Sequence, residues 1–353
     1  MNEIRLFVIT VVAILLAGVT SSVSAQGITH FEEIAPDLYF VGNVSHNTVF
    51  LVTETGIILA DPTNRDFSME LKAEIEERFD VPVRYVLYSH HHGDHVSGGA
   101  VWEDTALFIG HENMLSHFEL PPADTPLPPE VAEWDADGNG RIAKAEAPDW
   151  TGFNTVSRGP YVIEGFIERI FDFYDVDGDG SLTGAEVERG ALNEVRVPDI
   201  TYRDRITVTL GGKTAEMVFT GVQTHSDDLS VIVFPEQSVA YMADFISIIR
   251  LPRYIRGNDE PIESWLDGIR VVEAQNFTIA APGHGVVGGS EYVTFSREYL
   301  TKLRDEVAAG IAAGETVEEL QERIYMEEYS DWISYDEFRA GNIEDMYNLL
   351  TRD

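Results

Sequence analysis

Cysteine is absent from this 353-residue chain. Its absence excludes disulfide bonds, thiol catalysis, zinc–thiolate sites and lipid attachment at an N-terminal cysteine. Basic residues are scarce, because 24 lysines and arginines stand against 61 aspartates and glutamates, which gives a formal net charge of −37. A surface this acidic repels nucleic acid and anionic membranes, so we expect neither as a partner. It suits cation binding or a salt-rich setting.

Long apolar runs are missing after the first 25 residues, so no later segment is expected to cross a bilayer. The first residues have the pattern of a signal peptide: Arg5 is the positive start, 6–19 form the apolar core, and Ala25 ends a small-residue cleavage site. An uncleaved membrane anchor is the alternative, although the apolar run is short for one. We therefore predict a periplasmic or secreted protein with no stable membrane insertion once residues 1–25 are removed.

The most informative stretch of the chain is Ser-His-His-His-Gly-Asp-His at 89–95, which follows an apolar, strand-like run at 83–87. Five of its seven residues can ligate a metal, and a strand that runs into a glycine-containing turn lets such side chains converge. A helix at 66–79 precedes the run. Strand, helix and strand in this order, with ligands at a strand end, predict an α/β fold.

Four further residues capable of binding or orienting a metal stand at predicted strand ends. Asp61 follows the strand at 56–60, where it either orients a ligand histidine or serves as a turn residue. The other three are His225, Asp244 and His284.

The spacing His-x-His-x-Asp-His resembles the signature of the metallo-β-lactamase superfamily. The loop around His225, the pair Ala243-Asp244 and the turn Pro-Gly-His284-Gly follow in the family's order, although the family usually has glycine where this chain has Ala243. The resemblance covers most of residues 33–310. It implies a four-layer αββα sandwich and two zinc ions, with iron or manganese as possible substitutes.

The resemblance also implies which residue does what, in an arrangement like that of glyoxalase II. The first zinc would be held by His90, His92 and His225, the second by Asp94, His95 and His284, and Asp244 would bridge the two. His91 lies between ligands and should point away from them. The remaining histidines match no motif position and are expected to be structural or on the surface; they are His30, His46, His111 and His117. His46 stands in an N-terminal loop that can overhang such a site.

A second motif lies between the turn at 89–95 and the loop around His225. Five prolines within 121–129 mark a linker, and two segments beyond it fit the EF-hand calcium loop. Each has oxygen-bearing side chains at positions 1, 3 and 5, glycine at 6, an apolar residue at 8 and glutamate at 12. We expect an inserted all-α EF-hand pair, up to two bound calcium ions, and a short β-bridge between Ile142 and Leu182. The calcium-loop residues are Asp135, Asp137, Asn139, Arg141 and Glu146 in the first loop and Asp175, Asp177, Asp179, Ser181 and Glu186 in the second.

These patterns predict five segments along the chain. They are a signal peptide (1–25), the first part of the hydrolase-like domain (26–118), the EF-hand insert (119–198), the second part of that domain (199–310), and a C-terminal helical tail (311–353).

The implied ligand set predicts a reaction. Two cations about 3.5–4 Å apart can share a hydroxide that attacks a polarised carbonyl carbon. Asp94 would orient this nucleophile and carry a proton to the leaving group. We predict hydrolysis of an ester, lactone, thioester or lactam bond in a small-molecule substrate, with calcium stabilising the fold. Three alternatives stay open: a β-lactamase specifically, a di-iron redox enzyme, or a calcium-dependent binding protein.

Substrate recognition is predicted from one basic segment. Arg250, Arg253 and Arg256 lie within seven residues, soon after Asp244, in a chain with few basic residues. These arginines can clamp a substrate anion, and Tyr254 can polarise a carbonyl. Alternatively, they neutralise neighbouring acids on the surface.

Overall fold

The computed structural model describes residues 27–147, 171, 173–190, 192–193, 195–255 and 260–352. The predicted signal peptide, Arg256 and the segment 148–170 of the predicted insert lie outside the described residues. Among the helices that are described, none combines the length and apolar composition needed to cross a membrane.

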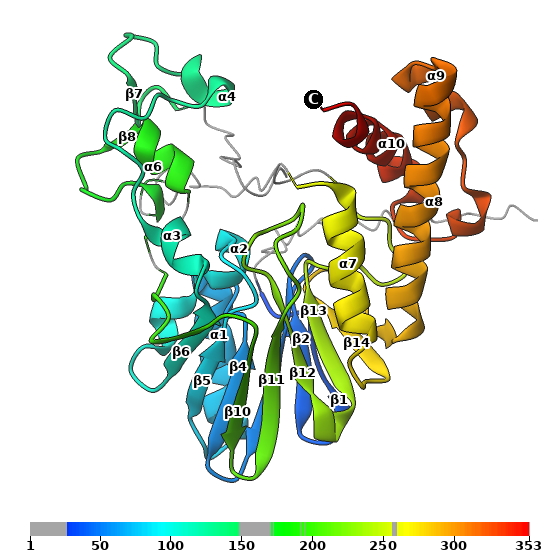
Figure 1. The fold of residues 1–353 in the computed structure, drawn as a ribbon. Coiled ribbons are helices and arrows are strands. Elements are labelled where there is room, and N and C mark those ends of the chain that lie inside the picture. The colour runs from blue at the N-terminus through cyan, green and yellow to red at the C-terminus, as the bar shows by residue number, and fades with distance from the viewer. Residues whose placement is uncertain are drawn as a thin grey trace, which may run out of the picture.

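Two β-sheets form the centre of the molecule (Figure 1). The first has the order β1-β2-β3-β4-β5-β6-β9, with strands at His30–Ala35, Leu38–Gly42, Asn47–Thr53, Gly56–Ala60, Val83–Leu87, Leu107–His111 and Ile200–Tyr202. The second runs β10 to β15 in sequence order, with strands at Arg205–Leu210, Lys213–Phe219, Ser230–Phe234, Val239–Ala243, Ile279–Pro282 and Gly288–Gly289. In the first sheet β4, β5, β6 and β9 are parallel, as are β13 and β14 in the second. The predicted α/β fold is confirmed.

Three apolar clusters hold helices and sheets in four layers. Helix α1 (Arg65–Arg78) covers the outer face of the first sheet through Phe67, Leu71 and Ile75. Side chains such as Leu51 and Ile232 pack between the two sheets. Helices α7 (Ile262–Glu273) and α8 (Glu291–Ala313) cover the outer face of the second sheet. The order is therefore helix, sheet, sheet, helix.

The start of α1 differs from the predicted one. Asn64, not Asp66, caps the helix, because its side chain accepts a hydrogen bond from the backbone N–H of Phe67. Asp66 lies in the first turn, where a negative charge interacts favourably with the helix dipole.

The region predicted as an insert contains short elements above one end of the sandwich (Figure 1). They are α4 (Pro129–Ala132), β7 (Arg141–Ala143), β8 (Ser181–Thr183) and α6 (Gly184–Arg189), and helix α3 (Met114–Phe118) precedes the region. Strands β7 and β8 are antiparallel and place Ile142 opposite Leu182, which confirms the predicted bridge. These two residues belong to a separate small core. The apolar residues Phe166 and Ile170 predict a helix that enters the second loop, and this segment lies almost entirely outside the described residues.

The described part of the predicted C-terminal tail, residues 311–352, packs on the same core as the second sheet. Helix α8 crosses the predicted boundary at residue 310, and α9 (Val317–Arg323) and α10 (Tyr335–Thr351) follow it. Thr316 and Glu319 form a capping box at the start of α9, as a threonine followed three residues later by glutamate predicts. Leu320, Ile343 and Met346 are buried in the core of α7 and α8. The short helical turns are α2 (Gly93–Val96), η1 (Gly99–Trp102), η2 (Pro235–Gln237) and η3 (Glu327–Tyr329).

Candidate metal centre

All seven predicted metal-binding side chains meet at one end of the sandwich. The turn after β5 and the single-turn helix α2 supply four of them; the loop before β12 and the ends of β13 and β14 supply the rest. They form two groups in which potential ligand atoms lie within 4.8 Å of one another. The groups are His90, His92, His225 and Asp244, and Asp94, His95, Asp244 and His284.

Asp244 belongs to both groups and presents a different oxygen to each. Its Oδ2 is 3.7 Å from Nε2 of His225, while its Oδ1 is 3.0 Å from Nε2 of His95 and 3.1 Å from Nε2 of His284. In the first group, Nε2 of His225 lies 3.3 Å from Nε2 of His90. A carboxylate placed in this way can bridge two cations.

Two buried polar atoms of the site are also suited to bind metal ions. Nε2 of His95 and Oδ1 of Asp244 are buried, and neither has a hydrogen-bond partner of acceptable geometry within the described part of the chain. Buried polar atoms rarely remain unsatisfied in proteins, and coordination of a cation satisfies both. Imidazole and carboxylate without thiolate suit zinc, iron or manganese.

Asp61 orients two of the histidines. Its buried carboxylate accepts hydrogen bonds from Nδ1 of His95 (2.7 Å) and from the backbone N–H (2.7 Å) and hydroxyl (2.6 Å) of Ser89. The Ser89 oxygen in turn lies 2.9 Å from Nδ1 of His90. Both histidines therefore keep Nε2 toward the centre, which is the usual role of a carboxylate behind a metal-binding imidazole. Of the two readings of Asp61, the structure favours the orienting one.

Electrostatics divide the histidines into two classes. Burial lowers the pKa values of His90, His92 and His225, so these rings are neutral at pH 7. Burial acts in the same direction on His284, but the adjacent Asp244 outweighs it and raises the pKa of His284 to about 10. The pKa of His95 is also raised, because Asp244 and Asp94 outweigh its burial.

Backbone conformation at two small residues brings strand ends together. Ala243 has φ +48°, in the left-handed region that glycine adopts more easily. The chain thus keeps the conformation but not the glycine that is usual in the resembling family. At Gly283, a Cβ atom would lie 2.8 Å from Cε1 of His95, so a side chain there would displace a candidate ligand.

His91 points away from the centre, as predicted. Its Nδ1 is 3.1 Å from Oδ1 of the buried Asp228, and its ring stacks on that of His117 with centroids 3.5 Å apart and planes at 4°. Nε2 of His117 is 2.7 Å from Oδ1 of Asp227. Because the two ring planes are parallel, their in-plane lone pairs do not converge on one ion. The cluster instead ties α3 to both loops that carry the first group.

A cleft of about 490 Å³ opens onto the metal-binding side chains and is also lined by the predicted substrate residues Arg250, Arg253 and Tyr254. The guanidinium of Arg250 is half-buried and lies 5.5 Å from the ring centroid of Phe338 on α10. That of Arg253 lies over the Tyr254 ring at 5.2 Å. Burial lowers the pKa of Arg250, and the nearby Arg253 adds to this effect. An anion entering the cleft would therefore meet positive charge.

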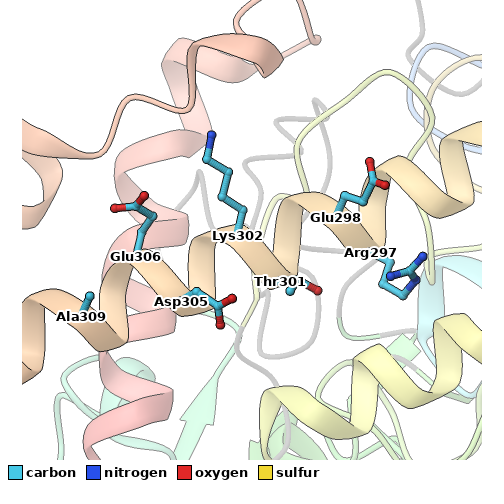
Figure 2. Close-up of a pocket in the computed structure, with 7 residues that line it drawn as sticks. All are labelled: Arg297, Glu298, Thr301, Lys302, Asp305, Glu306 and Ala309. Carbon is cyan, nitrogen blue, oxygen red and sulfur yellow. The ribbon is translucent and has the colours of Figure 1, made fainter.

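Another hollow, of about 440 Å³, lies along one face of α8 (Figure 2). It is lined by one helix only, and its charged side chains point in different directions. Four of them already have partners outside the hollow: Arg297 contacts Glu273, Lys302 contacts Glu328, Asp305 contacts Arg304 and Glu306 contacts Arg323. Metal-binding residues do not line it, so we assign no function to it.

The two predicted calcium loops have matching geometry. In the second, Asp175 accepts hydrogen bonds from the backbone N–H groups of Gly178 and Gly180, and Glu186 turns inward to accept from Val176 and Thr183. The first loop repeats this pattern. Asp135 accepts from Asn139 and Gly140, and Glu146 accepts from Ala136 and Ala143. Asp135, Asp137 and Glu146 form a potential cation site. Arg141 pairs with Asp179 across the loops.

Sequence reasoning missed several polar residues around the centre, among them Ser89 and Tyr241. The Tyr241 hydroxyl lies 3.0 Å from Oδ2 of Asp61. His46 does reach the site, with Nε2 3.3 Å from Oδ2 of Asp94. By contrast, His111 binds the carbonyl of Arg203, and the His30 ring packs on Phe40 at the cleft wall.

Comparison with known proteins gives one family match. A family model described as the metallo-beta-lactamase superfamily matches residues 41–284. No curated protein sequence matches the chain significantly.

The comparison with solved structures gives matches of low sequence identity, two of which follow. A metallo-beta-lactamase from Pontibacter korlensis is 15% identical with a TM-score of 0.49, over 77% of this chain and 98% of its own. The stereoselective inverting sec-alkylsulfatase Pisa1 from Pseudomonas sp. is 17% identical with a TM-score of 0.59, over 90% of this chain and 49% of its own. The chain thus spans about half of the sulfatase, and at this identity the likeness concerns the fold.

Proposed function

The chain belongs to the metallo-beta-lactamase superfamily and is a metal-dependent hydrolase, and we propose that it is an exported dinuclear zinc enzyme cleaving an ester, lactone, thioester or lactam bond. The observation that carries the proposal is the position of Asp244, which faces both groups of ligand atoms with different oxygens. Its substrate is a small molecule that fits the cleft of about 490 Å³.

The zinc ions, when bound, supply a nucleophile derived from water and polarise the bond under attack. The chain's own residues supply the rest. Asp94 lies within the second group and lines the cleft, where it can hold a proton and pass it to the leaving group. Asp61 and Ser89 keep the imidazoles oriented, so little reorganisation is needed during reaction.

We further propose that Arg250 and Arg253 hold an anionic part of the substrate. Arg250 faces the cleft, and within the described residues no carboxylate lies within ion-pair distance of its guanidinium. Glu337 and Asp244 lie near enough to oppose the lowering of its pKa by burial but form no ion pair with it, so its guanidinium can still bind a ligand anion.

The arginines make sulfate esters a second candidate substrate class. A sulfate group accepts the forked hydrogen bonds that guanidinium offers, and the structurally similar Pisa1 is a sec-alkylsulfatase. A sulfate ester and a substrate that carries a carboxylate would differ in the bond that is cleaved. The arginines would bind the anionic group in the same way in both.

The test is hydrolysis by the zinc-loaded protein, followed by acid release at constant pH. The panel holds β-lactams, acyl-homoserine and aliphatic lactones, simple esters, a glutathione thioester and a secondary alkyl sulfate. Zinc-dependent turnover of one class identifies the reaction. Failure on every class with both zinc ions bound would refute the proposal and favour redox chemistry. Asp94→Asn with full zinc occupancy should lose turnover by at least about 100-fold, and near-normal turnover would exclude Asp94 from proton transfer.

Arginine recognition has its own test. Arg250→Ala and Arg253→Ala should raise KM for anionic substrates by roughly 10-fold or more, with less effect on neutral analogues. Arg203→Ala, at a surface position, is the control. Equal effects on anionic and neutral substrates would contradict the assignment.

We also propose that the loops at 135–146 and 175–186 bind calcium and stabilise the fold. Their inward-facing carboxylates and paired β7 and β8 support this. Export rests on the pattern of residues 1–25 alone, and its test is whether the mature N-terminus begins at Gln26.

A further inference from the structure

A short loop of the first half of the chain, Asn43–Asn47, lies against the second group of metal-binding residues. Asn43 fixes its shape, because its side-chain oxygen accepts hydrogen bonds from the backbone N–H groups of Ser45 and His46, each at 2.8 Å. The backbone N–H of Asn43 also donates to the carbonyl of His46 at 2.9 Å. The loop is therefore a closed turn held at both ends.

This loop is hydrogen-bonded to the turn that carries His284. The backbone N–H of Asn47 donates to the carbonyl of Gly283 at 2.7 Å, and its side-chain amide donates to the carbonyls of Pro282 and Gly285. The carbonyl of Ser45 accepts from Nδ1 of His284 at 2.5 Å. That bond leaves Nε2 of His284 facing Asp94 and Asp244.

His46 extends the same loop to the second ligand of that group. The imidazole is buried, its Nε2 lies 3.3 Å from Oδ2 of Asp94, and its ring meets the His284 ring edge to face at 4.8 Å. A carboxylate on a single-turn helix such as α2 has few local restraints. A donor on its oxygen fixes the direction in which that oxygen points.

We propose that His46 is a positioning residue: by donating to Asp94, it holds this carboxylate in the orientation that the second metal site requires. The first group is oriented separately, since Ser89 contacts His90. His46 should therefore affect one metal ion of the pair and leave the other unchanged. The inference rests on the proposed dinuclear centre and extends it to a residue outside the family motif.

The test is titration of the metal-free full chain with zinc against a chromophoric chelator. Residues that orient metal ligands typically contribute 10- to 100-fold in affinity. His46→Leu should therefore weaken one zinc site by about that factor and leave the other at its wild-type affinity. His46→Gln should recover most of the loss, because the glutamine amide can donate from a similar position. Val44→Ala, in the same loop and 70% exposed, should bind both ions normally.

Several results would overturn the assignment. Two zinc sites of wild-type affinity in His46→Leu would show that the Asp94 carboxylate keeps its orientation without His46. Equal weakening of both sites would indicate a general structural role. No recovery in His46→Gln, with one site weakened in both variants, would make His46 itself a metal ligand. Wild-type binding of fewer than two ions would instead refute the dinuclear centre, and the role of His46 with it.

Discussion

Replacing Asp61 by asparagine tests how far the centre depends on a residue that orients its candidate ligands. The carboxylate is fully buried, and its two oxygens accept from Ser89, His95 and Tyr241 at 2.6–3.0 Å. Asparagine keeps the shape but turns one oxygen into an N–H donor. At least one partner then faces a donor instead of an acceptor.

Two magnitudes follow from this geometry. Loss of an orienting carboxylate should lower zinc affinity by about 10- to 100-fold, which corresponds to roughly 1.4–2.7 kcal/mol. In the metal-free protein the pair of Asp61 and His95 is buried on both sides, at 0% and 1% exposure. Breaking one partner of such a pair costs about 3–5 kcal/mol. We expect the lower end, because Asp94 and Asp244 still face His95.

Zinc titration against a chelator and urea unfolding of the metal-free protein measure the two effects independently. Asp104→Asn is the control, because this residue is exposed and forms a surface pair with Lys72, so its change should stay within about 1 kcal/mol. If Asp61→Asn bound both zinc ions at wild-type affinity and unfolded at the wild-type urea concentration, the orienting role would be refuted.

Two further predictions concern protons and calcium. At pH 8 His284 is protonated in the metal-free protein, since burial lowers its pKa but Asp244 and Asp94 outweigh burial and raise it to about 10. Zinc must displace this proton, so loading should release at least about one per molecule in weak buffer, whereas release of none would contradict the pairing of His284 with Asp244. Because the folded pKa of His284 exceeds the unfolded value near 6.5, its stabilising contribution is complete below pH 6.5 and lost as the pH rises through 10. Selective chelation of calcium should lower the melting temperature, and Glu186→Gln should remove part of that response; an unchanged melting temperature would mean that calcium does not stabilise the fold.

The convergence of the candidate metal ligands could be predicted because their signal in the sequence is local. The turn at 89–95 and the Pro-Gly-His284-Gly turn are short patterns whose residue types are dictated by coordination chemistry. The capping box of Thr316 and Glu319 is equally local, and the structure contains it. Strand β1 and helix α7 were not predicted, although α7 buries Trp265 and Leu266 in the core.

The residues that orient the ligands could not be predicted, because their partners are distant in the chain. Asn47 binds the carbonyl of Pro282, which is 235 positions away, and neither periodicity nor spacing records such a contact. Ser89 acts through its hydroxyl, which donates to Asp61 and contacts Nδ1 of His90, and a serine before a histidine is common in sequences. Only the assembled sheets bring these groups together.

The C-terminal helices do not form a separate tail, because they contact the segment 249–255, which helps to line the cleft. The backbone of Leu251 donates to the carbonyl of Ile333, and Ile333 donates to that of Ile249. Asp345 on α10 accepts from the backbone N–H of Ile255. The segment 249–255, which carries Arg250 and Arg253, is therefore held at both ends. A free arginine side chain loses about 2 kcal/mol of rotamer entropy when it is fixed. Because Arg250 already packs on Phe338, part of this cost is met during folding and less remains when an anion binds.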